Sequence, residues 1–219
     1  MLLKRKLLFF GLGILIAWVI LFGVDYSRFL ANENPLFSIR ASDASGAIIY
    51  IGPGYKVAKE GNITEMTTIF GKQRRMSFAE DNINAIQEYL TGGYAKPDNA
   101  EKFASFKIYG YSFVSDEKVE AYLWVVEDTF FPQQGKIVRE SCSSTPCLVT
   151  VDISNDGFKV IGKQFPRDGS LYRQDMKEMF PAWIRYRLNN IHRSDEITKL
   201  SQENRSKARQ HFFPLEFGN

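Results

Sequence analysis

One stretch of the chain is apolar on every side, and it lies near the N-terminus. Residues 7–24 contain no charge, and as a helix they would measure about 27 Å at ~1.5 Å per residue, close to the ~30 Å hydrocarbon core of a bilayer. Lys4, Arg5 and Lys6 precede this stretch, so the positive-inside rule predicts that residues 1–6 stay in the cytoplasm. A cleaved signal peptide is the main alternative, but no Ala-x-Ala follows Val24. We therefore expect an uncleaved, single-pass membrane anchor.

Beyond a predicted stalk at residues 25–34, the pattern changes to short strands and then to helices. Polar and apolar residues alternate in two hairpins, and apolar residues later recur at helical spacing. The expected strands are 37–40, 47–51, 104–114, 118–127, 148–153 and 158–161, and the expected helices are 77–91, 171–180, one beginning at 181, and 194–212. Strands first and helices last predict an α+β fold, in which C-terminal helices pack on an antiparallel sheet. We expect residues 35–219 to form one extracytoplasmic domain.

The charge distribution changes the list of partners. The formal net charge is +3, but three of the 28 basic residues precede the anchor, so 25 basic residues face 25 acidic residues in the rest of the chain. A domain without net charge has no general attraction for a phosphate backbone. The sequence therefore predicts no nucleic-acid partner, and it predicts contact with the lipid bilayer through residues 7–24.

Two cysteines lie five positions apart in Ser-Cys142-Ser-Ser-Thr-Pro-Cys147. A disulfide that closes this short loop fits an oxidising exterior and is the favoured interpretation. Free thiols and a thiol-based active site are the alternatives, although a redox site of the thioredoxin type would have two residues between the cysteines. A zinc site would need further ligands, and His192 and His211 do not have a metal-binding spacing. We expect no metal and no cofactor.

Few residues suggest a ligand site or catalysis. The densest aromatic stretch contains Tyr122, Trp124 and Phe130, for which core packing is the main interpretation and a ligand groove the functional one. His192 is the candidate general base of a hydrolase. The carboxylates of Glu120, Glu127 and Asp128 could act as acid and base, but we interpret them as solvated charges at a strand edge.

Three motifs resemble a known group of proteins. Ile51-Gly-Pro-Gly-Tyr-Lys-Val57, Ala121-Tyr-Leu-Trp-Val-Val-Glu127, and Pro166-Arg-Asp-Gly-Ser-Leu-Tyr172 with Met179-Phe-Pro181 downstream are similar to segments of uncharacterised membrane-anchored or lipoprotein-like extracytoplasmic proteins of Gram-positive bacteria. The resemblance implies a bacterial source and a place in the cell envelope. It implies no activity and no catalytic residue.

Taken together, these patterns favour a membrane-tethered extracytoplasmic module that binds, senses or assists, without catalysis. Its partner would be an unidentified protein or small molecule. One alternative is a cell-envelope enzyme that uses Cys142 and Cys147 as thiols or His192 as a base. The other is a self-assembling or inhibitory protein that uses a sheet edge or the last helix.

Overall fold

The protein consists of two compact units. The structure, a computed structural model, describes residues 2–42, 48–60, 63–68, 70–92, 99–154 and 157–214. The first unit is Met1–Ala79 and the second is Glu80–Asn219. This boundary lies inside residues 35–219, which were expected to form one domain. It could not be predicted because no Gly- or Pro-rich linker marks it in the sequence.

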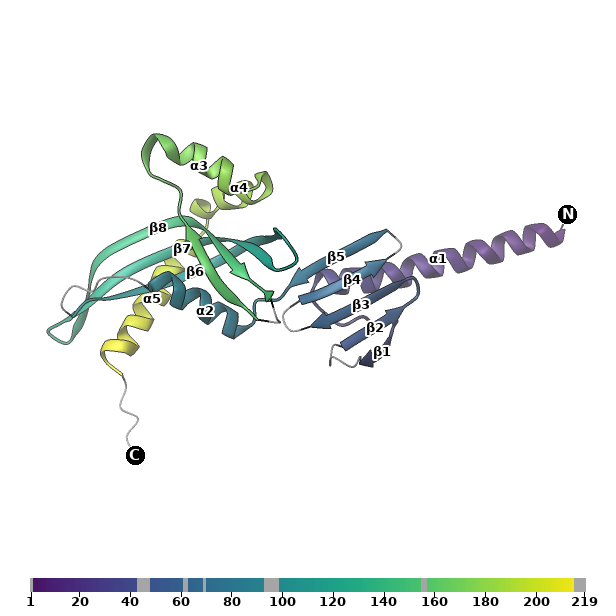
Figure 1. The fold of residues 1–219 in the computed structure, drawn as a ribbon, viewed down its shortest axis with the longest axis horizontal. Coiled ribbons are helices and arrows are strands. Elements are labelled where there is room, and N and C mark those ends of the chain that lie inside the picture. The colour runs from purple at the N-terminus through teal and green to yellow at the C-terminus, as the bar shows by residue number, and fades with distance from the viewer. Residues whose placement is uncertain are drawn as a thin grey trace, which may run out of the picture. The chain divides into compact units, whose positions relative to one another are not determined.

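The first unit combines a long helix with an antiparallel meander. Helix α1 spans Leu2–Leu30 and continues through the first residues of the predicted stalk. The sheet has five strands in sequential order, and α1 runs along it before extending toward the N-terminus (Figure 1). The strands are β1 (Ile39–Ser42), β2 (Ile48–Gly52), β3 (Tyr55–Glu60), β4 (Ile63–Thr68) and β5 (Gly71–Met76).

A buried carboxylate explains why α1 does not stop at the first charged residue after the apolar run. Asp25 is fully buried, and its two oxygens accept hydrogen bonds from the backbone N–H groups of Leu36 at 2.6 Å and Phe37 at 2.9 Å. The hydroxyl of Tyr55 also donates to Asp25. With its charge satisfied in this way, Asp25 belongs to the core of the first unit.

Residues at helical spacing on α1 pack on one face of the sheet. Phe29 forms a cluster with Tyr50, Val57 and Met66. Val57 on β3 is the cross-strand partner of Tyr50 on β2 and of Met66 on β4. Phe22 packs at the edge of this cluster. One stretch of α1, Phe9–Leu30, is long and apolar enough to cross a membrane, with a mean hydropathy of 2.0. An apolar N-terminal helix, as predicted, is therefore present.

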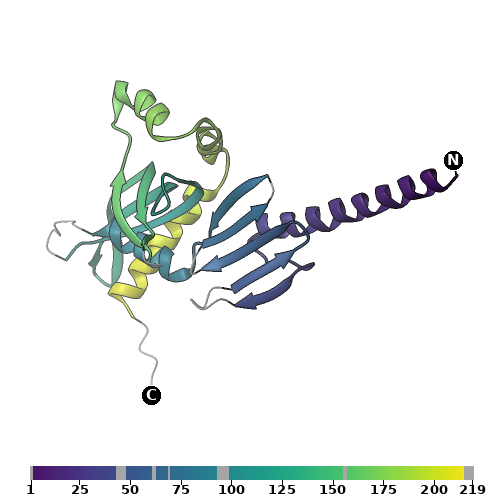
Figure 2. The same cartoon turned by 45° about the vertical axis from the view of Figure 1, so that its right-hand side comes forward.

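The second unit is built on three long antiparallel strands and a shorter fourth strand, in the sequential order β6 to β9. Figure 2 shows α5, in yellow, running along these strands. The strands are β6 (Glu101–Phe113), β7 (Lys118–Gln133), β8 (Lys136–Asp152) and β9 (Lys159–Gln164). The helices are α2 (Glu80–Thr91), α3 (Tyr172–Met179), α4 (Ala182–Asn189) and α5 (Glu196–Phe212), with 3-10 turns η2 (Gly169–Leu171) and η3 (Ile191–Arg193).

The C-terminal helices cover one face of this sheet, as predicted. Tyr122 and Trp124 of β7 pack with Phe180, Ile184 and residues of α3, α4 and α5 in one buried cluster. The α+β class and the antiparallel pairing are therefore confirmed, with the difference that the described residues form two sheets where one was expected. Strand β8 also begins well before residue 148, so the cysteine segment is part of a continuous strand.

Candidate ligand-binding groove

A groove runs between α5 and strand β8 of the second unit. It consists of two adjoining cavities of about 850 and 630 Å³, which share Ile137 and Arg205. The larger cavity is lined by Gly135, Lys136, Ile137, Arg205, Arg209, Gln210, Phe213 and Pro214. The smaller one is lined by Val126, Phe130, Ile137, Arg139, Cys142, Ile197, Thr198, Ser201, Gln202 and Arg205. We call the two together the α5–β8 groove.

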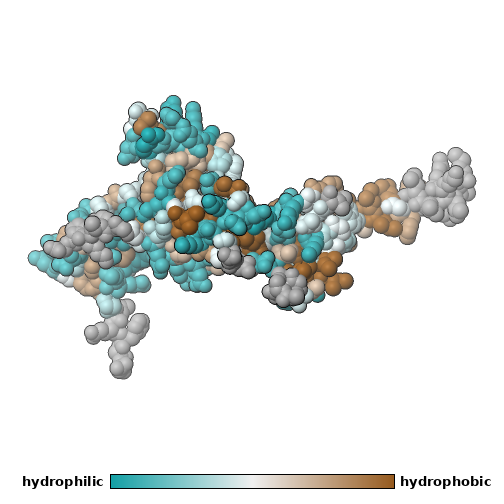
Figure 3. Space-filling model, viewed as in Figure 1, coloured by the Kyte–Doolittle hydropathy of each residue, from teal (hydrophilic) through white to brown (hydrophobic). Residues whose placement is uncertain are grey.

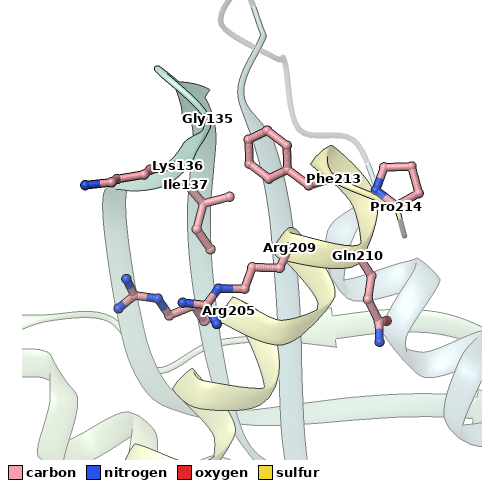
Figure 4. A pocket seen from close by; sticks show the side chains of 8 residues that line it. All are labelled: Gly135, Lys136, Ile137, Arg205, Arg209, Gln210, Phe213 and Pro214. Carbon is pink, nitrogen blue, oxygen red and sulfur yellow. The ribbon is translucent and has the colours of Figure 1, made fainter. Parts of the chain in front are cut away.

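The larger cavity combines apolar walls with basic side chains. In Figure 4 the ring of Phe213 stands beside Ile137, and the side chains of Arg205 and Arg209 extend from α5 toward β8. Lys136 borders the cavity, but its side chain points away from it in Figure 4. An apolar surface next to two guanidinium groups is suited to a molecule that has both an apolar body and a negative group.

Arg205 and Arg209 are one helical turn apart, so their side chains share a face of α5. Like charges at this spacing destabilise a helix slightly, by about 0.2–0.5 kcal/mol, unless an anion lies between them. Within the described residues neither guanidinium has an acidic partner, whereas the neighbouring Lys207 pairs with Glu203 at 2.6 Å. Guanidinium groups bind carboxylates and phosphates in a planar, bidentate manner. The pair is therefore a candidate anion site.

The smaller cavity lies beside a fully buried carboxylate, that of Asp128. Asn204 donates its amide N–H to Asp128 Oδ2 at 2.9 Å, and Ser201 donates its hydroxyl to the same oxygen at 3.3 Å. Arg139 reaches Asp128 Oδ1 at 3.3 Å. A register shift produces this last contact: Thr129 pairs with Ser141 and Phe130 pairs with Arg139, so Glu140 is the extra residue of a bulge. The interpretation of Asp128 as a solvated edge charge was wrong.

The two cysteines do not form the predicted disulfide. Both are free thiols in one continuous strand, and in extended chain five residues span about 16 Å, whereas a disulfide needs Cα atoms roughly 4.4–6.8 Å apart. The odd separation also places Cys142, which pairs with Asp128, and Cys147, which pairs with Leu123, on opposite faces. The prediction failed because Ser-Ser-Thr-Pro resembles a turn, yet here it continues the β7–β8 ladder.

Neither thiol is activated. Burial, followed by the hydrogen bond and charge of Asp128, raises the pKa of Cys142 above its ordinary value. Burial raises the pKa of Cys147 to about 12. A nucleophilic cysteine needs the opposite shift, toward a stable thiolate at neutral pH.

The aromatic residues predicted as a possible groove are buried. Tyr122 and Trp124 are almost fully covered in the cluster beneath α3 and α4. Phe130 belongs to a different cluster, with Ile137 and Ala208, although its edge lines the smaller cavity. The structure therefore does not bring these three side chains together, and only Phe130 lies at the α5–β8 groove.

The remaining candidates lie apart from a catalytic arrangement. His192 is exposed, and its ring packs edge-to-face on Trp124 at 5.1 Å between centroids. Glu127 pairs with Lys102 at 2.8 Å, and Glu120 accepts a hydrogen bond from the Tyr122 hydroxyl at 3.3 Å.

The basic side of the groove was not predicted from the sequence. Arg205 and Arg209 are spaced four apart on a helix that was predicted, and that spacing could have identified them. The opposite wall was hidden, because residues 136–147 were not predicted as a strand. No family model, curated protein or solved structure matches this chain.

Proposed function

We propose that this protein is a membrane-tethered extracytoplasmic binding module whose α5–β8 groove takes an anionic ligand with an apolar body. Helix α1 is the tether, and the second unit carries the groove. The negative group of the ligand, a carboxylate or a phosphate, binds between Arg205 and Arg209. Its apolar body lies against Ile137 and Phe213.

The tether rests on the composition and exposure of α1. Its residues from 9 to 17 are all exposed, and large apolar side chains such as Phe9, Phe10 and Ile14 would otherwise face water. Transfer of such side chains into lipid is favourable by roughly 0.3–0.6 kcal/mol for each Leu, Ile, Phe or Val. The basic residues 4–6 favour a cytoplasmic N-terminus, which would place the second unit outside the cell.

One observation carries the choice of ligand: two guanidinium groups without an acidic partner in the described chain line a cavity of about 850 Å³ that has apolar walls. That volume lies within the usual range of small-molecule sites, which is roughly 300–1,000 Å³. A binding role is also favoured over thiol catalysis, because the pKa of Cys142 is raised.

The proposal can be tested with a defined anionic probe. We would use 4′-(trifluoromethyl)biphenyl-4-carboxylate and follow its ¹⁹F resonance with the full chain in phosphatidylcholine nanodiscs, with empty nanodiscs as the blank. The Arg205→Gln/Arg209→Gln variant should weaken binding at least tenfold, because both charge-assisted hydrogen bonds are lost. The uncharged amide of the same probe should bind weakly to both proteins.

A matched control lies on α3, where Arg173 and Lys177 are also exposed and one turn apart. Arg173→Gln/Lys177→Gln removes the same charge outside the groove and should leave the affinity unchanged. Equal loss in both double variants would mean that only the overall charge matters. Equal binding of carboxylate and amide would contradict an anion site.

A further inference from the structure

The five-stranded sheet of the first unit has one end that is unusually apolar. Ile39 and Ile51 are cross-strand partners and are 76% and 54% exposed, and Phe70, in the β4–β5 turn, is 79% exposed. The register places all three at the same end, since Gly52 pairs with Tyr55, Tyr55 with Thr68, and Thr68 with Gly71. We call Ile39, Ile51 and Phe70 the apolar rim. Figure 3 shows brown side chains gathered over the β1–β2 edge of this sheet.

The rim lies at the end of the sheet from which the N-terminal half of α1 emerges. The indole N–H of Trp18 donates to the carbonyl of Pro53, in the β2–β3 turn, at 2.8 Å. Farther along α1, the Tyr26 hydroxyl donates to Gln73 at 3.0 Å, away from that turn. Residues 9–17 of α1 are exposed all around, so the sheet covers the helix only from Trp18 onward.

This arrangement leaves too little uncovered helix to span a bilayer alone. From residue 7 to residue 17 the helix measures about 16 Å, and about 24 Å when it is counted from residue 2, at ~1.5 Å per residue. The hydrocarbon core is ~30 Å thick, and an interfacial layer of several ångströms lies on each side of it. The helix can therefore cross only if the end of the sheet beside Trp18 passes through the interfacial layer to the edge of the hydrocarbon core and the bilayer thins locally around it.

The turn at that end suits such a position. Backbone groups near hydrocarbon must be satisfied within the protein. Pro53 has no N–H group, and its carbonyl is bonded to Trp18. Gly54 has a φ of +85°, and a Cβ there would lie 3.0 Å from the Trp18 ring, so glycine permits the close approach of turn and helix.

Cations stand beside the rim on the sheet face that points away from α1. Lys56 is the cross-strand partner of Ile51, and Lys72 lies in the same row on β5. Both are exposed. Lysines next to exposed Ile and Phe, with a tryptophan at the same level, form the composition found where proteins meet lipid headgroups. Lys72 pairs with Glu65 at 2.7 Å, so Lys56 is the lysine that favours anionic lipids here.

We propose that the apolar rim inserts into the headgroup–acyl boundary of an anionic bilayer, so that the sheet and α1 bind the membrane as one unit. This inference rests on the proposed tether. It assigns the exposed residues Ile39, Ile51 and Phe70 a lipid partner, and it holds the first unit against the surface.

Spin-label accessibility tests the inference on the full chain in vesicles of phosphatidylglycerol and phosphatidylcholine. A Cys142→Ser/Cys147→Ala background, checked by circular dichroism, would receive single nitroxides through Ile39→Cys, Phe70→Cys, Glu60→Cys or Ile14→Cys. Collision with oxygen reports lipid, and collision with a water-soluble nickel chelate reports solvent. Glu60 is the matched control, since it is exposed at the opposite end of the sheet.

The oxygen-to-nickel ratio at positions 39 and 70 should exceed that at position 60 at least threefold. Ratios at 39 and 70 equal to that at 60, with a high ratio at position 14, would overturn the inference and leave the tether intact. A low ratio at position 14 as well would overturn the tether itself.

Discussion

Asn204 of α5 holds the buried carboxylate of Asp128 on β7. Its amide nitrogen donates to Asp128 Oδ2 and to the carbonyl of Val126, both at 2.9 Å, and both side chains are fully buried. A helix placed over a sheet by apolar contacts alone could slide along it, whereas these directional bonds set the position of α5. Because α5 and β8 form the two walls of the groove, the pair also fixes the shape of the groove.

Replacing Asn204 should therefore be costly. Asn204→Ala leaves the Asp128 carboxylate buried with weaker partners, so we expect a loss of about 2–4 kcal/mol in the free energy of unfolding. Thermal unfolding followed by far-ultraviolet circular dichroism measures it. Gln202→Ala, an exposed position on the same helix, is the control and should change stability by less than about 0.5 kcal/mol. A similar small change for Asn204→Ala would show that Asp128 does not depend on α5.

The thiols offer a chemical test of the strand that replaces the predicted disulfide loop. Cys142 is exposed but its pKa is raised, and Cys147 is buried with a pKa of about 12. In the native protein near pH 7.5, a disulfide-exchange reagent should modify Cys142 slowly and Cys147 only after unfolding. Cys147→Ala should leave the native signal unchanged, whereas Cys142→Ala should abolish it.

Two other outcomes would contradict this picture. If the thiols became detectable only after reduction, Cys142 and Cys147 would be joined by the disulfide that the sequence predicted. Rapid modification of Cys142 below pH 7 would indicate a stabilised thiolate and would support the enzyme alternative.

Elements with strong periodicity could be predicted from the sequence. The helices carrying Ile86 and Leu90, and later Leu200 and Ala208, place those residues in the core as expected, because spacing by three and four residues identifies a buried helix face. The same holds for β7, in which ten of the 16 positions are buried, on both faces, as its apolar residues on both sides predicted.

The parts that could not be predicted depend on long-range pairing. Strand β5, with Lys72, Arg74 and Arg75, is too polar to be identified alone and is a strand because it pairs with β4. The first half of β8 is likewise a strand because it pairs with β7. Asp25 marked the predicted end of the helix, and only its bonds to residues distant in sequence explain why α1 continues. The groove was missed for the same reason, since one of its walls is such a strand.

An ion pair of Arg167 and Asp175 gives the second unit a defined acid sensitivity. Arg167 bonds the carboxylate through its side chain at 2.7 and 2.9 Å and through its backbone N–H at 2.8 Å, which lowers the pKa of Asp175 to about 2. The carboxylate therefore stabilises the folded state above the ordinary pKa of 3.8, and this contribution is lost as the pH falls toward 2.

Asp175→Asn should accordingly lower the melting temperature at pH 7, and its difference from the parent protein should shrink between pH 4 and pH 2. Asp168→Asn removes a neighbouring exposed carboxylate and is the control, for which we expect little change. A deficit of Asp175→Asn that stayed constant down to pH 2 would mean that the carboxylate charge does not contribute.

Close packing of α4 against β6 makes a glycine necessary on β6. Gly110 lies at the bulge of β6, where a Cβ would stand 2.5 Å from Cη2 of Trp183 and 2.8 Å from Cδ1 of Ile184. Trp183 is half exposed and can shift, but Ile184 is fully buried in the main cluster. Gly110→Ala should therefore destabilise the second unit by about 1–3 kcal/mol, as overpacking does.

Gly162 of β9 provides the matched control for this last substitution. A Cβ at Gly162 would meet only Thr150, at 3.8 Å, which is ordinary contact. Replacing a glycine by alanine where space and backbone allow it reduces the entropy of the unfolded chain, so Gly162→Ala should be neutral or stabilising by up to about 1 kcal/mol. The two substitutions are chemically identical, but Gly110→Ala should lower the melting temperature, whereas Gly162→Ala should leave it unchanged or raise it. If Gly110→Ala were as well tolerated as Gly162→Ala, the close approach of Ile184 on α4 to Gly110 on β6 would be contradicted, and α4 would have to lie farther from β6.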